Sequence, residues 1–125
     1  MTVSEAEVLA WARRYDPQYF HADPEAAKTS IFGGLVAPGI YTAAIWRQLD
    51  HEINGDVRYI CGNGWDEVRW PNPLRPGECV QACSEILSLE PHPRHADRGR
   101  VLYAYRLQGE DVLLPPKAAR PSPAS

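Results

Sequence analysis

The chain has 125 residues, which suffice for one globular domain but not for two. Hydrophobic residues at 44% and charged residues at 23% exclude a disordered or fibrous chain, and no apolar run approaches the roughly 20 residues that a membrane-spanning helix needs. A net charge of −3 argues against a nucleic-acid partner, because nucleic-acid-binding domains normally carry a basic surplus. The N-terminal residues are acidic where a secretory signal is basic, so we expect a cytoplasmic protein with no membrane partner.

Capping signals predict two helices at the start of the chain. Ser4 followed by Glu7 fits a capping box, so we expect a first helix over residues 5–14, ending before the next Asp-Pro pair. Asp23 is a good N-cap with a proline directly after it, which predicts a second helix of one or two turns. The segment between these helices, residues 15–23, is expected to be non-helical.

The longest helical stretch follows Pro38. It is predicted over residues 40–52, with Asn54-Gly55 as its end. Its first half is apolar almost all the way round, which is typical of a helix in the middle of a domain.

Beyond the central helix the sequence predicts an antiparallel meander. The expected strands, separated by proline and glycine turns, are 65–70, 79–89, 101–108 and 112–114. Helices followed by a meander predict an α+β fold, with a sheet wrapped around the central helix. We expect a single domain over residues 1–116 and a disordered tail over residues 117–125.

The cysteines and histidines do not predict a disulfide or a metal site. The cysteines are odd in number and form no C-x-x-C pair, so we expect reduced core residues; they are Cys61, Cys79 and Cys83. His92, His95 and Asp97 lie in a proline-bearing loop without a second cluster that would complete a metal site, so no metal is expected.

Asp16 and His21 are the candidate catalytic residues. A carboxylate and an imidazole brought together position a water and move its protons, one accepting and the other donating. Taken alone, an Asp and a His five residues apart are more often structural than catalytic.

The pair lies within a longer pattern. Its segments are YDPQ at 15–18, FH at 20–21, SIFGGLVA at 30–37 with Gly39, DEVRW at 66–70, and PLRPGE at 73–78. This pattern resembles the MaoC-like acyl dehydratases, the family that includes the (R)-specific enoyl-CoA hydratases, over residues 5–114. The resemblance implies a hot-dog fold, a curled antiparallel sheet around one long helix. It also implies reversible hydration of a trans-2-enoyl thioester to a 3-hydroxyacyl thioester.

The resemblance also assigns roles to individual residues. It makes Asp16 and His21 the pair that holds the water, and Gly39 the residue whose backbone N–H receives the thioester oxygen. The N-terminus of a helix suits that role, because its free N–H groups and positive dipole end face a developing enolate. No metal or redox cofactor is implied, since the thioester itself acidifies the α-carbon. The expected substrate is a thioester of coenzyme A or of acyl-carrier protein.

Further side chains are candidates for substrate binding. Those expected along the acyl group are Phe32, Tyr41, Thr42 and Trp46. Thr42 is the hydroxyl nearest to Ala44, the position where hydratases of the family often carry a serine. Arg94 and Arg98 are candidates for holding coenzyme A phosphates. The remaining tryptophans are expected to be core or dimer-interface residues; they are Trp11, Trp65 and Trp70.

Two other functions stay open at this point. A catalytically silent hot-dog subunit that binds an acyl thioester or a partner is compatible with the abbreviated C-terminal hairpin, although the retained pair favours an enzyme. A hot-dog thioesterase usually carries its carboxylate on the central helix, which here offers only Asp50 and Glu52 at its far end. A homodimer is expected, because one hot-dog sheet leaves an edge and an apolar face uncovered. The sequence does not fix the acyl chain length or the pathway.

Overall fold

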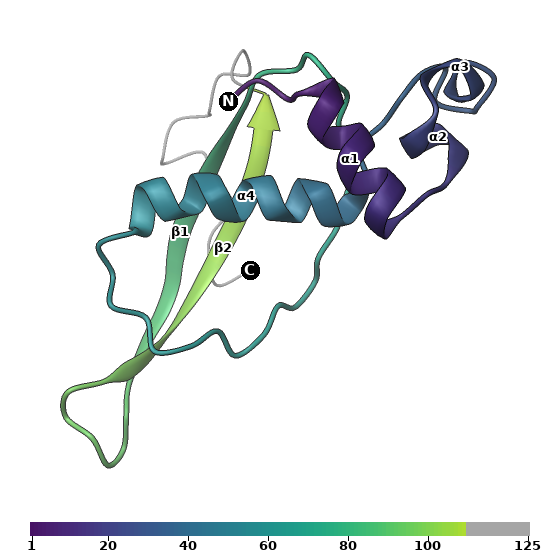
Figure 1. The fold of residues 1–125 in the computed structure, drawn as a ribbon. Coiled ribbons are helices and arrows are strands. Elements are labelled where there is room, and N and C mark those ends of the chain that lie inside the picture. Colours follow the sequence, from purple (N-terminus) through teal and green to yellow (C-terminus); the bar gives the residue numbers. More distant parts are fainter. Residues whose placement is uncertain (110–125) are drawn as a thin grey trace.

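The structure is a computed structural model that describes residues 1–109. Its elements are α1 (Glu5–Tyr15), α2 (Tyr19–Ala22), α3 (Pro24–Ala27), α4 (Gly39–Asn54), β1 (Val80–Pro91) and β2 (Gly99–Gly109). Figure 1 shows α4 lying across the two strands, with the three shorter helices beyond its N-terminal end. This arrangement confirms the predicted α+β class. The predicted strand 112–114 and the tail 117–125 lie outside the described residues.

Short-range hydrogen bonds set the helix starts. The N–H of Glu7 donates to Ser4 Oγ at 3.3 Å, so Ser4 is the N-cap of α1 as predicted. The Asp23 carboxylate accepts from two N–H groups in the first turn of α3, at 3.0 and 3.2 Å, which makes this residue a cap rather than a catalyst. The prediction of a non-helical segment 15–23 was wrong for α2. There the Gln18 carbonyl accepts a hydrogen bond from the N–H of His21, which closes a helical turn. No side chain caps the start of this turn.

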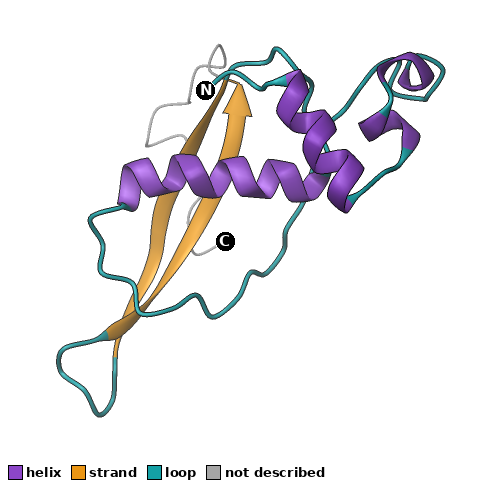
Figure 2. Ribbon diagram, viewed as in Figure 1, coloured by secondary structure: helices purple, strands orange, loops and turns teal. Residues whose placement is uncertain are grey.

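The sheet consists of one long, twisted hairpin in the described residues (Figure 2). The strands β1 and β2 pair antiparallel from Val80 opposite Gly109 to Pro91 opposite Gly99, with a register shift near Ile86. A bridge between Thr2 and the residue before β1 ties the N-terminus to this hairpin. Both long strands were predicted to within two residues of their bounds.

The predicted strand 65–70 was wrong. Residues 65–70 run as irregular chain without ladder partners among the described residues. Glu67 has a φ of 53°, which interrupts an extended backbone, and the prolines at 71 and 73 would stop a ladder from continuing beyond Trp70. The polarity of residues 65–70 alternates as in a strand, but among the described residues no neighbouring strand pairs with this segment.

The core lies between α1, α4 and the start of β1. Its buried side chains include Val8, Tyr41, Ile45, Leu74 and Val80. The central helix α4 contributes Tyr41 and Ile45 to this core, but only one of its faces is buried, since Ile40 in its apolar first half is 46% exposed.

The cysteine prediction was wrong in part. All three cysteines are free thiols, but Cys61 and Cys79 are exposed rather than in the core, and only Cys83 is partly buried. Cys61 lies in the irregular segment after α4, and Cys79 sits at the bridge, where its Sγ contacts Thr2 Oγ1 at 3.3 Å. No helix in the described part of the chain is both long enough and apolar enough to cross a membrane.

Candidate active site

The short helix α2 carries His21 into the interior. The residue is only 9% exposed, and its Nδ1 lies 2.6 Å from the backbone carbonyl oxygen of Val36. A carbonyl oxygen only accepts, so Nδ1 carries the hydrogen in this contact. The Val36 N–H in turn donates to the Phe20 carbonyl at 3.0 Å, which fixes the strip of chain that holds the ring. Nε2 is consequently the nitrogen available for proton exchange.

Asp16 brings a carboxylate to that nitrogen. It lies at the C-cap of α1, where its N–H donates to the Ala12 carbonyl at 2.9 Å. Its Oδ2 is 3.6 Å from Nε2 of His21, and its side chain is partly exposed. This gap is longer than a direct hydrogen bond, and a small polar molecule such as water can bond to both groups. The structure thus brings the two predicted residues together.

A cleft of about 270 Å³ opens beside His21. Four of the predicted site residues line it: His21, Phe32, Gly39 and Thr42. The opposite wall comes from the irregular chain at 70–74, which the sequence analysis did not assign to the site. Asp16 is not itself a lining residue but contacts the wall at His21.

The N-terminus of α4 opens into the same cleft. Gly39 is the first residue of this helix, and the N-cap Pro38 provides no side-chain hydrogen bond. The N–H groups of Tyr41 and Thr42 both donate to the Pro38 carbonyl, at 3.0 and 3.1 Å. Within residues 1–109 the N–H of Gly39 has no acceptor. A free N–H at the positive end of a 16-residue helix is a site for a developing negative charge.

Trp70 is one of the cleft residues that were not predicted from the sequence. Its indole lies against Gly39, so that a Cβ built on this glycine would come 2.9 to 3.3 Å from three ring carbons. Trp70 was expected in the core or at a dimer interface; its exposed fraction of 53% excludes the core, and in this chain the residue lines the cleft. The only signal was its place at the end of the DEVRW segment, and the alternation there predicted a strand face instead.

The remaining predicted binding residues do not line the cleft. Tyr41 is buried against Trp11, with ring centroids 5.9 Å apart; burial, and then the charge of Glu7, raise its pKa. Trp46 packs on Tyr105 at a centroid distance of 4.4 Å. Both contacts belong to the packing of α4 against its neighbours.

Arg94 and Arg98 lie in the loop that joins β1 to β2. Figure 1 shows this loop at the end of the hairpin remote from α1 and α2. Both side chains are exposed, and Arg98 pairs with Asp97 at 3.4 Å. Neither arginine lines the cleft of its own chain.

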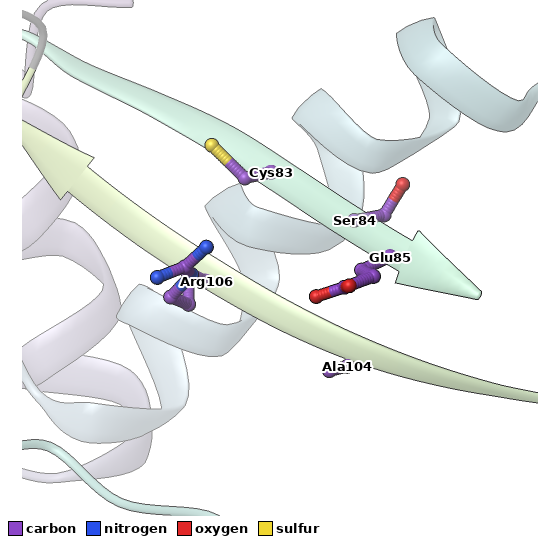
Figure 3. A pocket seen from close by; sticks show the side chains of 5 residues that line it. All are labelled: Cys83, Ser84, Glu85, Ala104 and Arg106. Carbon is purple, nitrogen blue, oxygen red and sulfur yellow. The ribbon is translucent and has the colours of Figure 1, made fainter. Parts of the chain in front are cut away.

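A second depression lies on the hairpin itself, far too small for an acyl group. Figure 3 shows its lining residues, Cys83, Ser84, Glu85, Ala104 and Arg106. Its volume of about 20 Å³ has room for roughly one water. In the described part of the chain, no three His, Cys, Asp or Glu side chains converge as metal ligands would.

An antiparallel sheet with one long helix across it, in an α+β chain of this order, is the hot-dog fold, and solved structures share it. The MaoC-like dehydratase from Rhodospirillum rubrum superposes with a TM-score of 0.69 at 33% identity, over 88% of this chain and 75% of that one. The monoamine oxidase regulatory protein from Archaeoglobus fulgius gives a TM-score of 0.74 at 23% identity, over 88% and 74% of the two chains. The second likeness supports the fold alone.

The MaoC-like domain profile matches residues 1–97, so the chain belongs to the MaoC-like dehydratase family. It is also 33% identical over 94 residues to 3-hydroxyacyl-thioester dehydratase Z of Mycobacterium tuberculosis, which covers 72% of this chain and 62% of that protein. The chain thus spans about six-tenths of this relative's length. The predicted family and fold are both confirmed.

Proposed function

We propose that the protein is a hydro-lyase that reversibly hydrates trans-2-enoyl thioesters to 3-hydroxyacyl thioesters. The observation that carries this proposal is that His21, whose Nε2 lies 3.6 Å from the Asp16 carboxylate, lines the same cleft as Gly39 at the start of α4. Membership of the MaoC-like family and the name of the mycobacterial relative support it.

The pair supplies the proton transfers. Asp16 accepts a proton from the water as the water oxygen bonds to C3 of the enoyl group. In this step Nε2 of His21 donates a proton to C2. The proton on Asp16 then returns to Nε2 across the 3.6 Å gap, so the pair ends as it began and one water has been added. In the reverse direction the same steps remove water from the 3-hydroxyacyl thioester.

Gly39 stabilises the charge that develops between these steps. Attack at C3 moves negative charge onto the thioester oxygen, and the Gly39 N–H lies at the positive end of α4 where that oxygen is received. A donor of this kind typically accounts for about 10²–10³ in turnover. The proposal requires no metal or redox cofactor, because the reaction consists of the addition of a water oxygen to C3 and of proton transfers beside a carbonyl that already acidifies C2.

The carrier of the acyl group is coenzyme A or acyl-carrier protein. Since Arg94 and Arg98 lie away from the cleft of their own chain, their predicted role in holding coenzyme A phosphates requires a second copy of the chain. We therefore propose a homodimer, in which the hairpin loop of one protomer approaches the cleft of its partner.

The thioesterase alternative is disfavoured by the position of Asp50. This carboxylate is buried, accepts a hydrogen bond from Asn54 at 2.8 Å, and pairs with Arg47 at 3.6 Å. It does not line the cleft, so it is not placed to attack a thioester there or to activate a water.

A spectrophotometric assay across a ladder of trans-2-enoyl-CoA chain lengths tests the proposal. The wild type should consume the enoyl absorbance of at least one length and form the 3-hydroxyacyl thioester, without releasing free thiol. Release of thiol would assign a thioesterase, and no turnover at any length, for CoA and acyl-carrier-protein substrates alike, would leave a silent binding subunit.

A further inference from the structure

We propose that Trp70 is a specificity-determining residue that restricts the enzyme to acyl groups without a substituent at C2. The inference rests on the proposed function and adds a residue to it. It comes from one contact, the packing of the Trp70 indole on Gly39 at the mouth of α4.

The contact defines the space beside the thioester. The ring carbons Cε2, Cζ2 and Cδ2 of Trp70 lie 2.9, 3.1 and 3.3 Å from the point where a Cβ of residue 39 would stand. A side chain at position 39 therefore has no room, and the indole of Trp70 forms the wall of the cleft beside Gly39. A thioester oxygen that reaches the Gly39 N–H lies alongside this ring, because both residues line the same cleft.

The wall faces the carbon next to the thioester. C3 must lie at the water held by Asp16 and His21, and the thioester oxygen must lie at Gly39. C1 and C2 lie between these two points, and C2 is the one of them that can carry an extra substituent, so that substituent occupies the part of the cleft that Trp70 borders. A hydrogen fits beside a flat ring, whereas a methyl group has to displace it. One methyl group at a close-fitting wall typically changes the ratio of kcat/KM values between two substrates by about 10- to 200-fold.

The position allows a clean test. Trp70 is half-exposed and lies outside the helices and strands, so truncating it removes little core packing. Trp65 offers a matched control: it is 60% exposed, belongs to the same irregular segment, and contacts Trp46 at a centroid distance of 5.7 Å rather than the cleft.

The experiment compares kcat/KM for a trans-2-enoyl-CoA and for its 2-methyl derivative of equal chain length. Trp70→Ala should raise the ratio of 2-methyl to unsubstituted turnover by at least about tenfold. Trp70→Phe should give a smaller rise, and Trp65→Ala should leave the ratio at the wild-type value.

The failures are distinguishable. If the wild type hydrates the unsubstituted substrate but Trp70→Ala keeps the wild-type ratio, the specificity role is overturned while the proposed function stands. Equal loss on both substrates in Trp70→Ala and Trp70→Phe also overturns it. A wild type that hydrates neither substrate overturns the proposed function and the role of Trp70 with it.

Discussion

The carboxylate of Asp16 and the imidazole of His21 meet across a single turn of chain, with Oδ2 3.6 Å from Nε2. One residue ends α1 and the other lies on α2, with Pro17 between them. The pair is therefore built by local geometry, and the Val36 carbonyl oxygen, 2.6 Å from Nδ1 of His21, supplies a contact from further along the chain that orients the ring.

The contact between Gly39 and Trp70 predicts a stability coupling. From helix propensity alone, Gly39→Ala should be neutral or slightly stabilising, by up to about 1 kcal/mol. The structure predicts the opposite, a loss of roughly 1–3 kcal/mol, because the new methyl group meets the indole. In a Trp70→Ala background, Gly39→Ala should not lower the free energy of unfolding.

Urea unfolding of the four proteins of this double-mutant cycle measures the coupling. Gly62→Ala is the control, since a Cβ at that position meets no atom within 4 Å. Equal effects of Gly39→Ala in both backgrounds would show that the indole does not lie on this glycine.

A homodimer in solution is the second prediction. The two long strands have no further ladder partner strand among residues 1–109, and they expose apolar side chains such as Ile86, Leu89 and Leu102, which favours association of two copies. Sedimentation should give twice the 14.0 kDa of one chain. Leu102→Lys should weaken the dimer, whereas Ile31→Lys should not, because Ile31 is 96% exposed on a turn outside the hairpin. A 14.0 kDa species at micromolar concentration would contradict the prediction.

Tyrosine ionisation is expected to destabilise the fold at alkaline pH. Burial, and then the nearby charges of Asp50 and Tyr103, raise the pKa of Tyr105 from 10.0 to about 12. Because the folded pKa lies above the unfolded one, the stabilisation is complete below pH 10 and is lost as the pH rises toward 12. Tyr105→Phe should therefore flatten the fall in unfolding free energy across this window.

Unfolding free energies measured between pH 9 and pH 11.5 test this dependence, with Tyr15→Phe as the control at an exposed position. An unchanged alkaline slope in Tyr105→Phe would show that this phenol titrates normally. The phenol absorbance offers a second measure, since fewer than the six tyrosines should ionise in the native protein at pH 11.

Features set by neighbours along the chain were predictable from the sequence. Ser4 and Asp23 were identified as caps because a capping oxygen bonds N–H groups only two or three residues away. The central helix and the long hairpin followed from periodicity and turn residues. The pairing of Asp16 with His21 was indicated by their resemblance to a family pattern, since spacing alone was weak evidence.

Features set by distant contacts were not predictable. Alternation in the segment that ends at Trp70 indicated a strand, but a strand also needs a neighbour, and periodicity does not supply one. The position of Arg94 relative to the cleft likewise depends on how far the hairpin extends from α4, which residue types do not encode. The helix α2 is an exception among the local features: it was missed because Gln18 provides no capping side-chain bond to mark its start.

The shared water predicts that Asp16 and His21 act as one unit. Asp16→Asn removes the base and His21→Ala removes the donor, so each should lower kcat/KM by about 10²–10⁴. The double variant should lose little more than either single one. Asp23→Asn is the control, because the same chemical change at a helix cap leaves an oxygen to accept from the Glu25 N–H.

The most direct measurement is the rate of trans-2-enoyl-CoA hydration by the wild type, the two single variants and the double variant under one set of conditions. We predict a fast wild type, two slow single variants, and a double variant whose loss is close to that of the slower single one. A wild-type rate in Asp16→Asn, or losses that multiply in the double variant, would contradict a carboxylate and an imidazole acting together on one water.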